Sequence, residues 1–310
     1  FDVIVEFIVI LYLSDWAKYP NAILHLSTKN KSFIKLAALY RDMGVTNHGF
    51  LLALHNPRLE HVDPHDPNLP ITTQLEIVKE IRENPWYFFR EVAKAPPLAG
   101  SENSPFLANR ANIALFWFFF NHVTTVLIQP RQTGKSYSTD TLMIYLLNYG
   151  CSNTFINLLT RSDSLRDKNL ERLKKIQEEL PDYINFKCKG DIFNTEEIVL
   201  KDPRIKNSYK GNVSNASVKL ANSVGRGFTS PIFHIDEACF VPNVHIALPA
   251  ALMAGNAARE MARLNKSHFG TIITTTSGKL NEEESSYIYK LINAGTYINE
   301  NFYDSKDEKE

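Results

Sequence analysis

The chain has 310 residues, of which 44% are hydrophobic and 22% charged, and this is the composition of a globular protein able to bury a full core. Its 34 Lys and Arg residues balance its 34 Asp and Glu residues, which excludes a protein coated with positive charge for nucleic acid. A local basic groove for DNA or RNA would not show in this sum. The three cysteines are scattered without metal-binding spacing, which indicates a reducing, cytoplasmic setting.

The first 98 residues predict a small, mostly helical N-terminal subdomain. Apolar side chains recur at helical spacing over residues 32–41, and again in a helix that Thr72 or Thr73 would cap. Residues 95–104 contain two prolines and a glycine and are the strongest candidate for a domain boundary. The apolar opening, residues 1–13, is too short to span a bilayer, so we expect no membrane partner.

Residues 99–300 predict an α/β core in which short apolar strands alternate with helices. Strands are expected at 122–129, 154–159, 232–236 and 271–275, and helices at 109–121, 134–148 and 164–180. Residues 186–222 predict two or three antiparallel strands, and the aromatic run at 116–120 is interpreted as core packing. The alternation is typical of a mostly parallel sheet flanked by helices.

A phosphate-binding loop is predicted directly after the strand at 122–129. The loop reads Gln129-Pro130-Arg131-Gln132-Thr133-Gly134-Lys135-Ser136 and is followed by a helix. It matches the P-loop pattern except that Gln129 stands at the first glycine. Backbone N–H groups at a helix N-terminus form an anion cradle, and Gly134 lets the backbone approach phosphate. Lys135 is expected to reach the β and γ oxygens of ATP, and Ser136 to bind Mg²⁺.

The strand at 232–236 ends in two carboxylates, Asp236 and Glu237. An Asp at the end of a strand beside a P-loop is placed to hold Mg²⁺ through its water shell. A second carboxylate directly after it is placed to polarise an attacking water. His234 lies on the same strand face as Asp236, and we interpret it as a hydrogen-bonded strand histidine rather than a catalyst.

Two further segments suggest roles in hydrolysis. The strand at 271–275 ends in Thr274-Thr275-Thr276-Ser277-Gly278, whose hydroxyls could sense the γ-phosphate, although threonine is also simply a good strand former. Arg226 lies between Gly225 and Gly227, which suits an exposed arginine finger and equally suits a turn with a solvated arginine. Arg131, inside the loop, is a second finger candidate that would act within its own chain.

Four of these motifs together resemble one family, the ATPase motor domain of the large terminase subunit of tailed bacteriophages. The motifs are the loop at 129–136, Arg226-Gly227, residues 235–243 and residues 272–278. A basic residue early in a loop without the first glycine is characteristic of that family. So is an acidic pair followed closely by aromatic, Pro and Asn residues. The resemblance covers residues 70–300 and implies an ASCE-type P-loop NTPase.

The resemblance also implies a role for each matched residue. Lys135 and Ser136 would be Walker A residues, Asp236 the Walker B residue and Glu237 the catalytic glutamate. Arg131 would contact the γ-phosphate. Arg226 would be an arginine finger offered to a neighbouring subunit. Residues Thr274–Gly278 would couple hydrolysis to DNA movement. For the adenine contact, we choose Asn112.

The function implied by the resemblance is a Mg²⁺-dependent ATPase that threads viral double-stranded DNA into a procapsid. It would work as a ring on the portal protein, with the small terminase subunit, in the cytoplasm of the infected host cell. Two alternatives stay open from the residues alone. One is a helicase or remodelling ATPase, and the other is a nucleotide-binding assembly module with negligible hydrolysis.

The ends of the sequence predict a fragment of a longer protein. The chain begins at Phe1 rather than Met, and residues 301–310 form a polar tail. The family normally continues into a nuclease domain with clustered metal-binding carboxylates. The final acids Asp304, Asp307, Glu308 and Glu310 are interpreted as a solvated tail, so we expect no nuclease activity from this chain.

Overall fold

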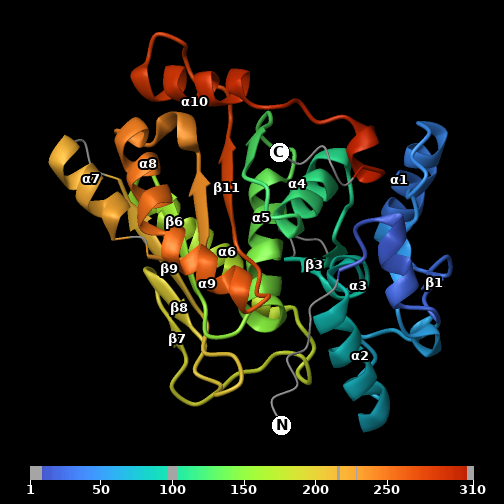
Figure 1. Cartoon of the computed structure of the whole chain (residues 1–310). Coiled ribbons are helices and arrows are strands. Elements are labelled where there is room, and N and C mark those ends of the chain that lie inside the picture. Colours follow the sequence, from blue (N-terminus) through green and yellow to red (C-terminus); the bar gives the residue numbers. More distant parts are fainter. Residues whose placement is uncertain (1–8, 97–102, 215–216, 228, 306–310) are drawn as a thin grey trace. The chain divides into compact units, whose positions relative to one another are not determined.

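The computed structural model describes residues 9–96, 103–214, 217–227 and 229–305, which form two compact units (Figure 1). Unit 1 combines the residues up to Trp117 with residues 175–186 and those from Ile298 onward, and unit 2 contains residues 118–174 and 187–297. The predicted division at residues 98 and 300 used single boundaries, whereas these units are discontinuous in sequence. The predicted linker and tail fall partly outside the described residues, at 97–102 and 306–310, as does most of the apolar opening.

Unit 1 is mostly helical. Its helices are α1 (Lys31–Asp42), α2 (Ile71–Glu83), α3 (Pro85–Tyr87), a π-helix at Phe88–Val92, most of α4 (Arg110–Phe120), and 3-10 turns at Leu13–Lys18, Phe50–Leu52, Pro57–Leu59 and Glu300–Tyr303. Two antiparallel pairs complete the unit: β1 (Ile23–Leu24) with β2 (Ala53–Leu54), and β3 (Lys94–Ala95) with β4 (Ser104–Pro105).

The start of α2 differs from the prediction. Neither Thr72 nor Thr73 caps the helix, because α2 begins at Ile71, directly after Pro70. The Pro70 carbonyl accepts the first helical hydrogen bond, from the backbone N–H of Gln74 at 3.0 Å. The N-cap is therefore Pro70, which has a φ of −57° and makes no side-chain cap hydrogen bond.

Unit 2 is built around a seven-stranded sheet. Its strands are β5 (Thr125–Ile128), β6 (Phe155–Thr160), β7 (Ile192–Phe193), β8 (Glu197–Val199), β9 (Ser208–Val213), β10 (Ile232–Asp236) and β11 (Gly270–Thr275). Their spatial order is β5-β11-β10-β6-β9-β8-β7, in which the first five are parallel and the last two antiparallel. The predicted mostly parallel α/β sheet is confirmed, and the antiparallel strands lie at one edge.

Helices cover the sheet of unit 2 (Figure 1). They are α5 (Lys135–Tyr145) with a π-helical extension at Leu146–Gly150, α6 (Asp163–Glu178), α7 (Val218–Arg226), α8 (Val244–Ala254), α9 (Asn256–Leu264) and α10 (Glu283–Ala294). A 3-10 turn at Ala238–Phe240 follows β10. The boundary between the two units falls within α4 and within α6. Among the described residues, we find no helix with the length and apolar character needed to cross a membrane.

The alternation of side chains along β10 separates two environments. Phe233 and Ile235 point to one face, where they pack in an apolar cluster with residues of α8 and with Ile288 of α10. His234 and Asp236 point to the other face, and their neighbours in register on β11 are Ile272 and Thr274. The polar end of β10 therefore faces the side of the sheet on which α6 lies.

One further prediction, on core packing, is confirmed, and another, on secondary structure, is wrong. The aromatic run at 116–120 is buried throughout, so its interpretation as core packing is confirmed. The strand expected to continue to residue 222 is wrong, because residues from Val218 form α7. Ala221 and Val224, three residues apart, both turn to the protein side at helical rather than strand spacing.

Candidate active site

The predicted phosphate loop connects the end of β5 to the start of α5. The backbone N–H of Gln129 donates to the carbonyl of Thr275 on β11 at 3.2 Å, and the Thr133 hydroxyl donates to the carbonyl of Pro130 at 3.0 Å. Gly134 has a φ of +81°, a left-handed conformation that glycine adopts without strain. Since α5 begins at Lys135, the first backbone N–H groups of the helix lie at the loop, where they suit an anion.

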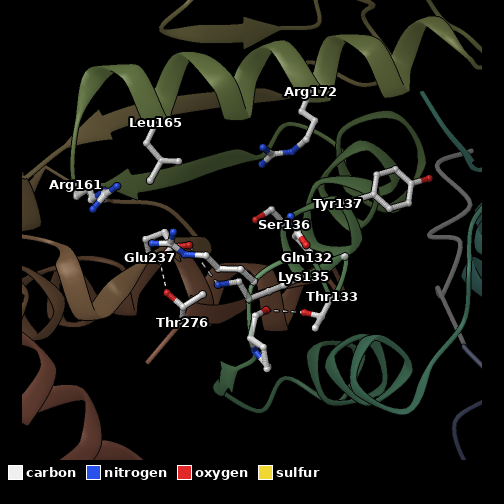
Figure 2. A pocket seen from close by; sticks show the side chains of 13 residues that line it. Gln132, Thr133, Lys135, Ser136, Tyr137, Arg161, Leu165, Arg172, Glu237 and Thr276 are labelled. Atoms are coloured by element: carbon white, nitrogen blue, oxygen red, sulfur yellow. Dashed lines mark hydrogen bonds and ion pairs between the residues drawn. The ribbon is translucent and has the colours of Figure 1, made fainter. Parts of the chain in front are cut away.

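A pocket of about 410 Å³ lies on this loop. It is lined by Pro130, Arg131, Gln132, Thr133, Gly134, Lys135, Ser136, Tyr137, Arg161, Leu165, Arg172, Glu237 and Thr276. Figure 2 shows Glu237 and Thr276 on one side of the pocket, Tyr137 on the other, and Arg172 reaching in from α6. Seven of the eight predicted loop residues, 130–136, thus line one pocket with Glu237, whereas Gln129 does not line it. The fold is that of a P-loop NTPase.

Lys135 is the buried cation of this pocket. Its residue exposure is 6%, and its Nζ atom has no hydrogen-bond partner among the described residues. The nearest carboxylate oxygen, Glu237 Oε1, lies 3.6 Å away. An ammonium group has three donors, and leaving them unbonded in a buried place is unfavourable. Phosphate oxygens in the pocket would satisfy these donors.

Glu237 stands at the tip between β10 and the following 3-10 turn. Its φ of +57° is left-handed, which is uncommon for a residue other than glycine and is found at functional sites. Its side chain is 22% exposed, and Oε2 accepts a hydrogen bond from the Thr276 hydroxyl at 3.0 Å. The predicted catalytic glutamate thus contacts the predicted coupling segment directly.

Asp236 is buried behind the pocket, with an exposure of 2%, and is not one of the lining residues. Its Oδ1 accepts from the Thr274 hydroxyl at 3.0 Å, and its Oδ2 accepts from Asn169 Nδ2 on α6, also at 3.0 Å. Both carboxylate oxygens are therefore held, so the orientation of the side chain is fixed.

His234 supports Asp236 from within the sheet. Its Nδ1 lies 3.3 Å from the Tyr209 hydroxyl and its Nε2 lies 3.3 Å from the Thr274 hydroxyl. Burial lowers the pKa of His234 to about 4, so the ring is neutral at physiological pH. The interpretation of His234 as a hydrogen-bonded strand histidine is confirmed.

The rest of the predicted coupling segment has structural contacts of its own. The Thr275 hydroxyl accepts from the backbone N–H of Cys239 at 3.0 Å, which ties β11 to the turn after Glu237. Ser277 is exposed. A side-chain carbon at Gly278 would collide with Ser285 of α10, so only glycine fits there.

The arginines divide into those inside the pocket and one outside it. Arg131 lines the pocket, while Arg226 is exposed at the last residue of α7 and does not line it. Sequence reasoning missed Arg161 and Arg172. Arg161 directly follows β6, at the strand end where ligands bind in parallel sheets, and this signal could have found it. Its guanidinium lies 5.6 Å from the ring centroid of Phe240.

Asn112, the predicted adenine contact, belongs to unit 1 and lies in the first turn of α4. Its Oδ1 accepts from the backbone N–H of Asn109 at 2.8 Å, and its Nδ2 donates to the Leu107 carbonyl at 2.8 Å. Asn109 accepts in return from the backbone N–H of Asn112 at 3.0 Å, which makes a reciprocal cap. The amide is thus used in the cap, and its role toward adenine stays a prediction.

The residues present fit Mg²⁺. The Ser136 hydroxyl lines the pocket, and Asp236 supplies carboxylate oxygens behind it. Within the ranges that the structure describes, no group of three or more His, Cys, Asp or Glu residues could hold a metal ion by itself. Mg²⁺ does not need such a group, because it keeps several waters and takes oxygens from substrate phosphates.

Comparisons with known proteins give matches only to solved structures. No family model and no curated protein matches the sequence. The large terminase of bacteriophage HK97 aligns with 11% identity and a TM-score of 0.46, over 70% of this chain and 41% of that one. The large terminase ATPase domain of Thermus phage P74-26 aligns with 14% identity and a TM-score of 0.42, over 62% and 71%. The chain thus spans less than half of the HK97 protein, and likeness at these scores assigns no activity.

Proposed function

We propose that this chain is an ATP-hydrolysing motor domain that moves viral double-stranded DNA into a procapsid, as a large terminase ATPase. The observation that carries the ATPase is the buried Lys135 Nζ, which faces Glu237 at 3.6 Å across a pocket made by the phosphate loop. The DNA-packaging role is supported by the four motifs in their order along the sequence.

Binding of the triphosphate follows from the charges and donors of the loop. The backbone N–H groups at the start of α5 and the ammonium of Lys135 would hold the β and γ oxygens. Arg131 and Arg161 line the same pocket and would neutralise the remaining charge of the phosphates. Mg²⁺, held by the Ser136 hydroxyl and by waters bonded to Asp236, would supply further charge neutralisation when bound.

Hydrolysis would be an in-line attack by water. The water oxygen forms a bond to the γ-phosphorus while the bond between that phosphorus and the β–γ bridging oxygen breaks. Glu237 accepts the proton that the water releases. Phosphate oxygens would take the donors of Lys135, and Glu237 Oε1 would then bind the water. Its Oε2 keeps the Thr276 hydroxyl, 3.0 Å away.

The Thr276 hydroxyl would couple ATP hydrolysis to movement of the DNA. Thr276 lies immediately after β11, so a change at Glu237 acts directly on the segment Thr274–Gly278. We propose this segment as the coupling element. Arg226, exposed and outside the pocket of its own chain, would complete the site of a neighbouring subunit in a ring. The portal protein and the small terminase subunit would be its partners in the host cytoplasm.

The test is steady-state Mg²⁺-ATP hydrolysis measured over a range of protein concentrations, comparing the wild type with Glu237→Gln and Arg226→Ala. Turnover that rises with concentration, and that both variants lose while they still bind nucleotide, supports the ring motor. If the wild type binds ATP but hydrolyses none at any concentration, the motor is excluded for this chain and an assembly module takes its place. A DNA-stimulated rate that needs no self-association would favour a helicase or remodelling ATPase instead.

A further inference from the structure

A series of buried and partly buried hydrogen bonds connects the phosphate-loop helix to the acidic strand through α6. Arg172 Nε donates to Asp140 Oδ2 of α5 at 2.5 Å, and Arg172 Nη2 donates to Asn169 Oδ1 at 2.5 Å. Asn169 Nδ2 in turn donates to Asp236 Oδ2 at 3.0 Å. Asp140 and Asn169 have no exposed surface, whereas 30% of the Arg172 side chain is exposed at the pocket. We call these four residues the Arg172 relay.

The relay joins the two residues that would bind Mg²⁺. Asp140 follows Ser136 by four residues on α5, so the two lie one helical turn apart on the same side of the helix. The other end of the relay is Asp236 itself. A single guanidinium group therefore fixes the helix that carries Ser136 relative to the carboxylate of Asp236.

Stability alone is a weak explanation for this arrangement. Asp140 Oδ1 has no hydrogen-bond partner within the described part of the chain, so the carboxylate is only partly compensated by Arg172. A buried ion pair of this kind stabilises a fold no better than apolar side chains of similar volume. The placement of the pair, between the pocket and Asp236, is better explained by a role in the site.

The geometry of Arg172 suits a positioning role. Its planar fork donates to Asp140 and to Asn169 from two nitrogens in fixed positions, whereas a lysine would have to reach both acceptors from a single flexible ammonium. These bonds use Nε and Nη2. Figure 2 shows the guanidinium directed from α6 toward the phosphate loop. Arg172 thus lies where it can respond to the bound nucleotide while it holds Asn169.

We propose that Arg172 is a positioning residue that sets the affinity of the nucleotide site for Mg²⁺ by holding Asp236 through Asn169. This inference rests on the proposed function as an ATPase. Without the relay, the Asp236 side chain keeps only its hydrogen bond from Thr274. Its carboxylate would then be less well oriented to accept from the waters bound to Mg²⁺. Groups that orient metal-binding side chains in this way change metal affinity by about tenfold or more when they are removed.

The test measures binding rather than turnover. A fluorescent ATP analogue is bound to the full 310-residue chain and titrated with Mg²⁺, and the Mg²⁺ concentration at half effect is compared among variants. Arg172→Lys keeps the charge but loses the fork, and Asn169→Ala keeps every charge but breaks the relay. We expect both to need about tenfold more Mg²⁺, while the affinity measured without Mg²⁺ is unchanged.

Arg166→Lys is the matched control. Arg166 lies on the same helix, where it pairs with Asp163 and Asp167 and does not line the pocket, so its variant should need the wild-type Mg²⁺ concentration. The relay is overturned if Arg172→Lys shows the wild-type Mg²⁺ requirement, whether or not Asn169→Ala folds. An effect of Arg172→Lys that a folded Asn169→Ala does not share also overturns it. If the wild type binds no nucleotide even with Mg²⁺, the proposed function itself fails.

Discussion

The two neighbouring carboxylates Glu237 and Asp236 have opposite surroundings. Glu237 lies on the surface of the pocket, and Asp236 lies in the buried layer behind it. Glu237, in the pocket, has one hydroxyl as its hydrogen-bond donor and an ammonium 3.6 Å away. Asp236, one residue earlier, has both oxygens bonded and an exposure of 2%. A carboxylate that must exchange partners during a reaction, such as Glu237, keeps free hydrogen-bonding capacity. A carboxylate that must stay in place, such as Asp236, has both oxygens hydrogen-bonded.

This difference separates the expected effects of mutation. Changes in the pocket surface should reduce activity and leave the free energy of unfolding nearly unchanged. Changes in the buried layer should reduce the free energy of unfolding, because they leave buried polar groups without partners. The four predictions that follow test this separation.

The largest effect is expected for Glu237→Gln. Glutamine keeps the volume and can still accept from Thr276, but it cannot take a proton from water. We expect kcat for ATP hydrolysis to fall by at least about 100-fold, within the usual range for a general base. Nucleotide affinity and the urea midpoint should stay at wild-type values. Loss of nucleotide binding together with kcat would contradict the separation.

Asp140→Ala tests the buried layer. It leaves Arg172 without its carboxylate, and we expect a loss of about 3 kcal/mol in the free energy of unfolding, measured with urea. This is at the lower end for broken buried pairs because Arg172 is partly exposed to the pocket. The control is Asp163→Ala, which removes a carboxylate that is 73% exposed from its pair with Arg166 on α6 and should change stability by less than about 0.5 kcal/mol. If Asp140→Ala and Asp163→Ala lowered the free energy of unfolding equally, the buried pair would contribute no more to stability than the pair at the surface.

Thr276→Val lies at the border of the two regions. Valine keeps the shape of the side chain but removes the hydroxyl that orients Glu237. We expect kcat to fall by about tenfold, with nucleotide affinity unchanged, because an oriented base is lost but the base itself remains. Single-turnover hydrolysis checks this step apart from product release. A rate equal to that of the wild type would mean that Thr276 does not orient the glutamate.

The smallest effect concerns pH. Burial outweighs the neighbouring Arg172 and raises the pKa of Asp140 from 3.8 to about 7. The folded protein therefore keeps this proton at pH values where the unfolded chain releases it. The contribution is complete below pH 3.8 and is lost as the pH rises through 7. Between pH 6 and pH 7 the wild type should lose about 1 kcal/mol more stability than Asp140→Asn, which cannot titrate. If the free energy of unfolding had the same pH dependence in the wild type and in Asp140→Asn, the raised pKa of Asp140 would be refuted.

The parts of the site that the sequence predicted are those encoded by contiguous residues. The phosphate loop and the acidic strand end each combine a strand, a turn and chemically specific side chains within about ten residues, so local signals suffice. The Arg172 relay draws on two helices and a strand end. Nothing in the sequence distinguishes Arg172 from the other charges of α6, which read as a solvated helix.

The same contrast applies to the fold. Strands β10 and β11 were predicted within one residue, because Ile, Phe and Thr, which favour strands, make up most of both. Helix α7 was missed because two of its apolar side chains, Val218 and Leu220, are exposed, so its apolar residues do not follow one buried face. Local propensity is a weak guide where tertiary contacts decide.

The most direct test of the account is the affinity for Mg²⁺-ATP of the wild type and of Lys135→Met, measured by isothermal titration calorimetry beside the thermal midpoint of each protein. Methionine removes a buried ammonium that has no hydrogen-bond partner among the described residues. We expect binding to weaken by at least about 100-fold, as for the loss of a key electrostatic contact, with a thermal midpoint equal to or above the wild type. Wild-type affinity in Lys135→Met would contradict the assignment of this pocket as the nucleotide site.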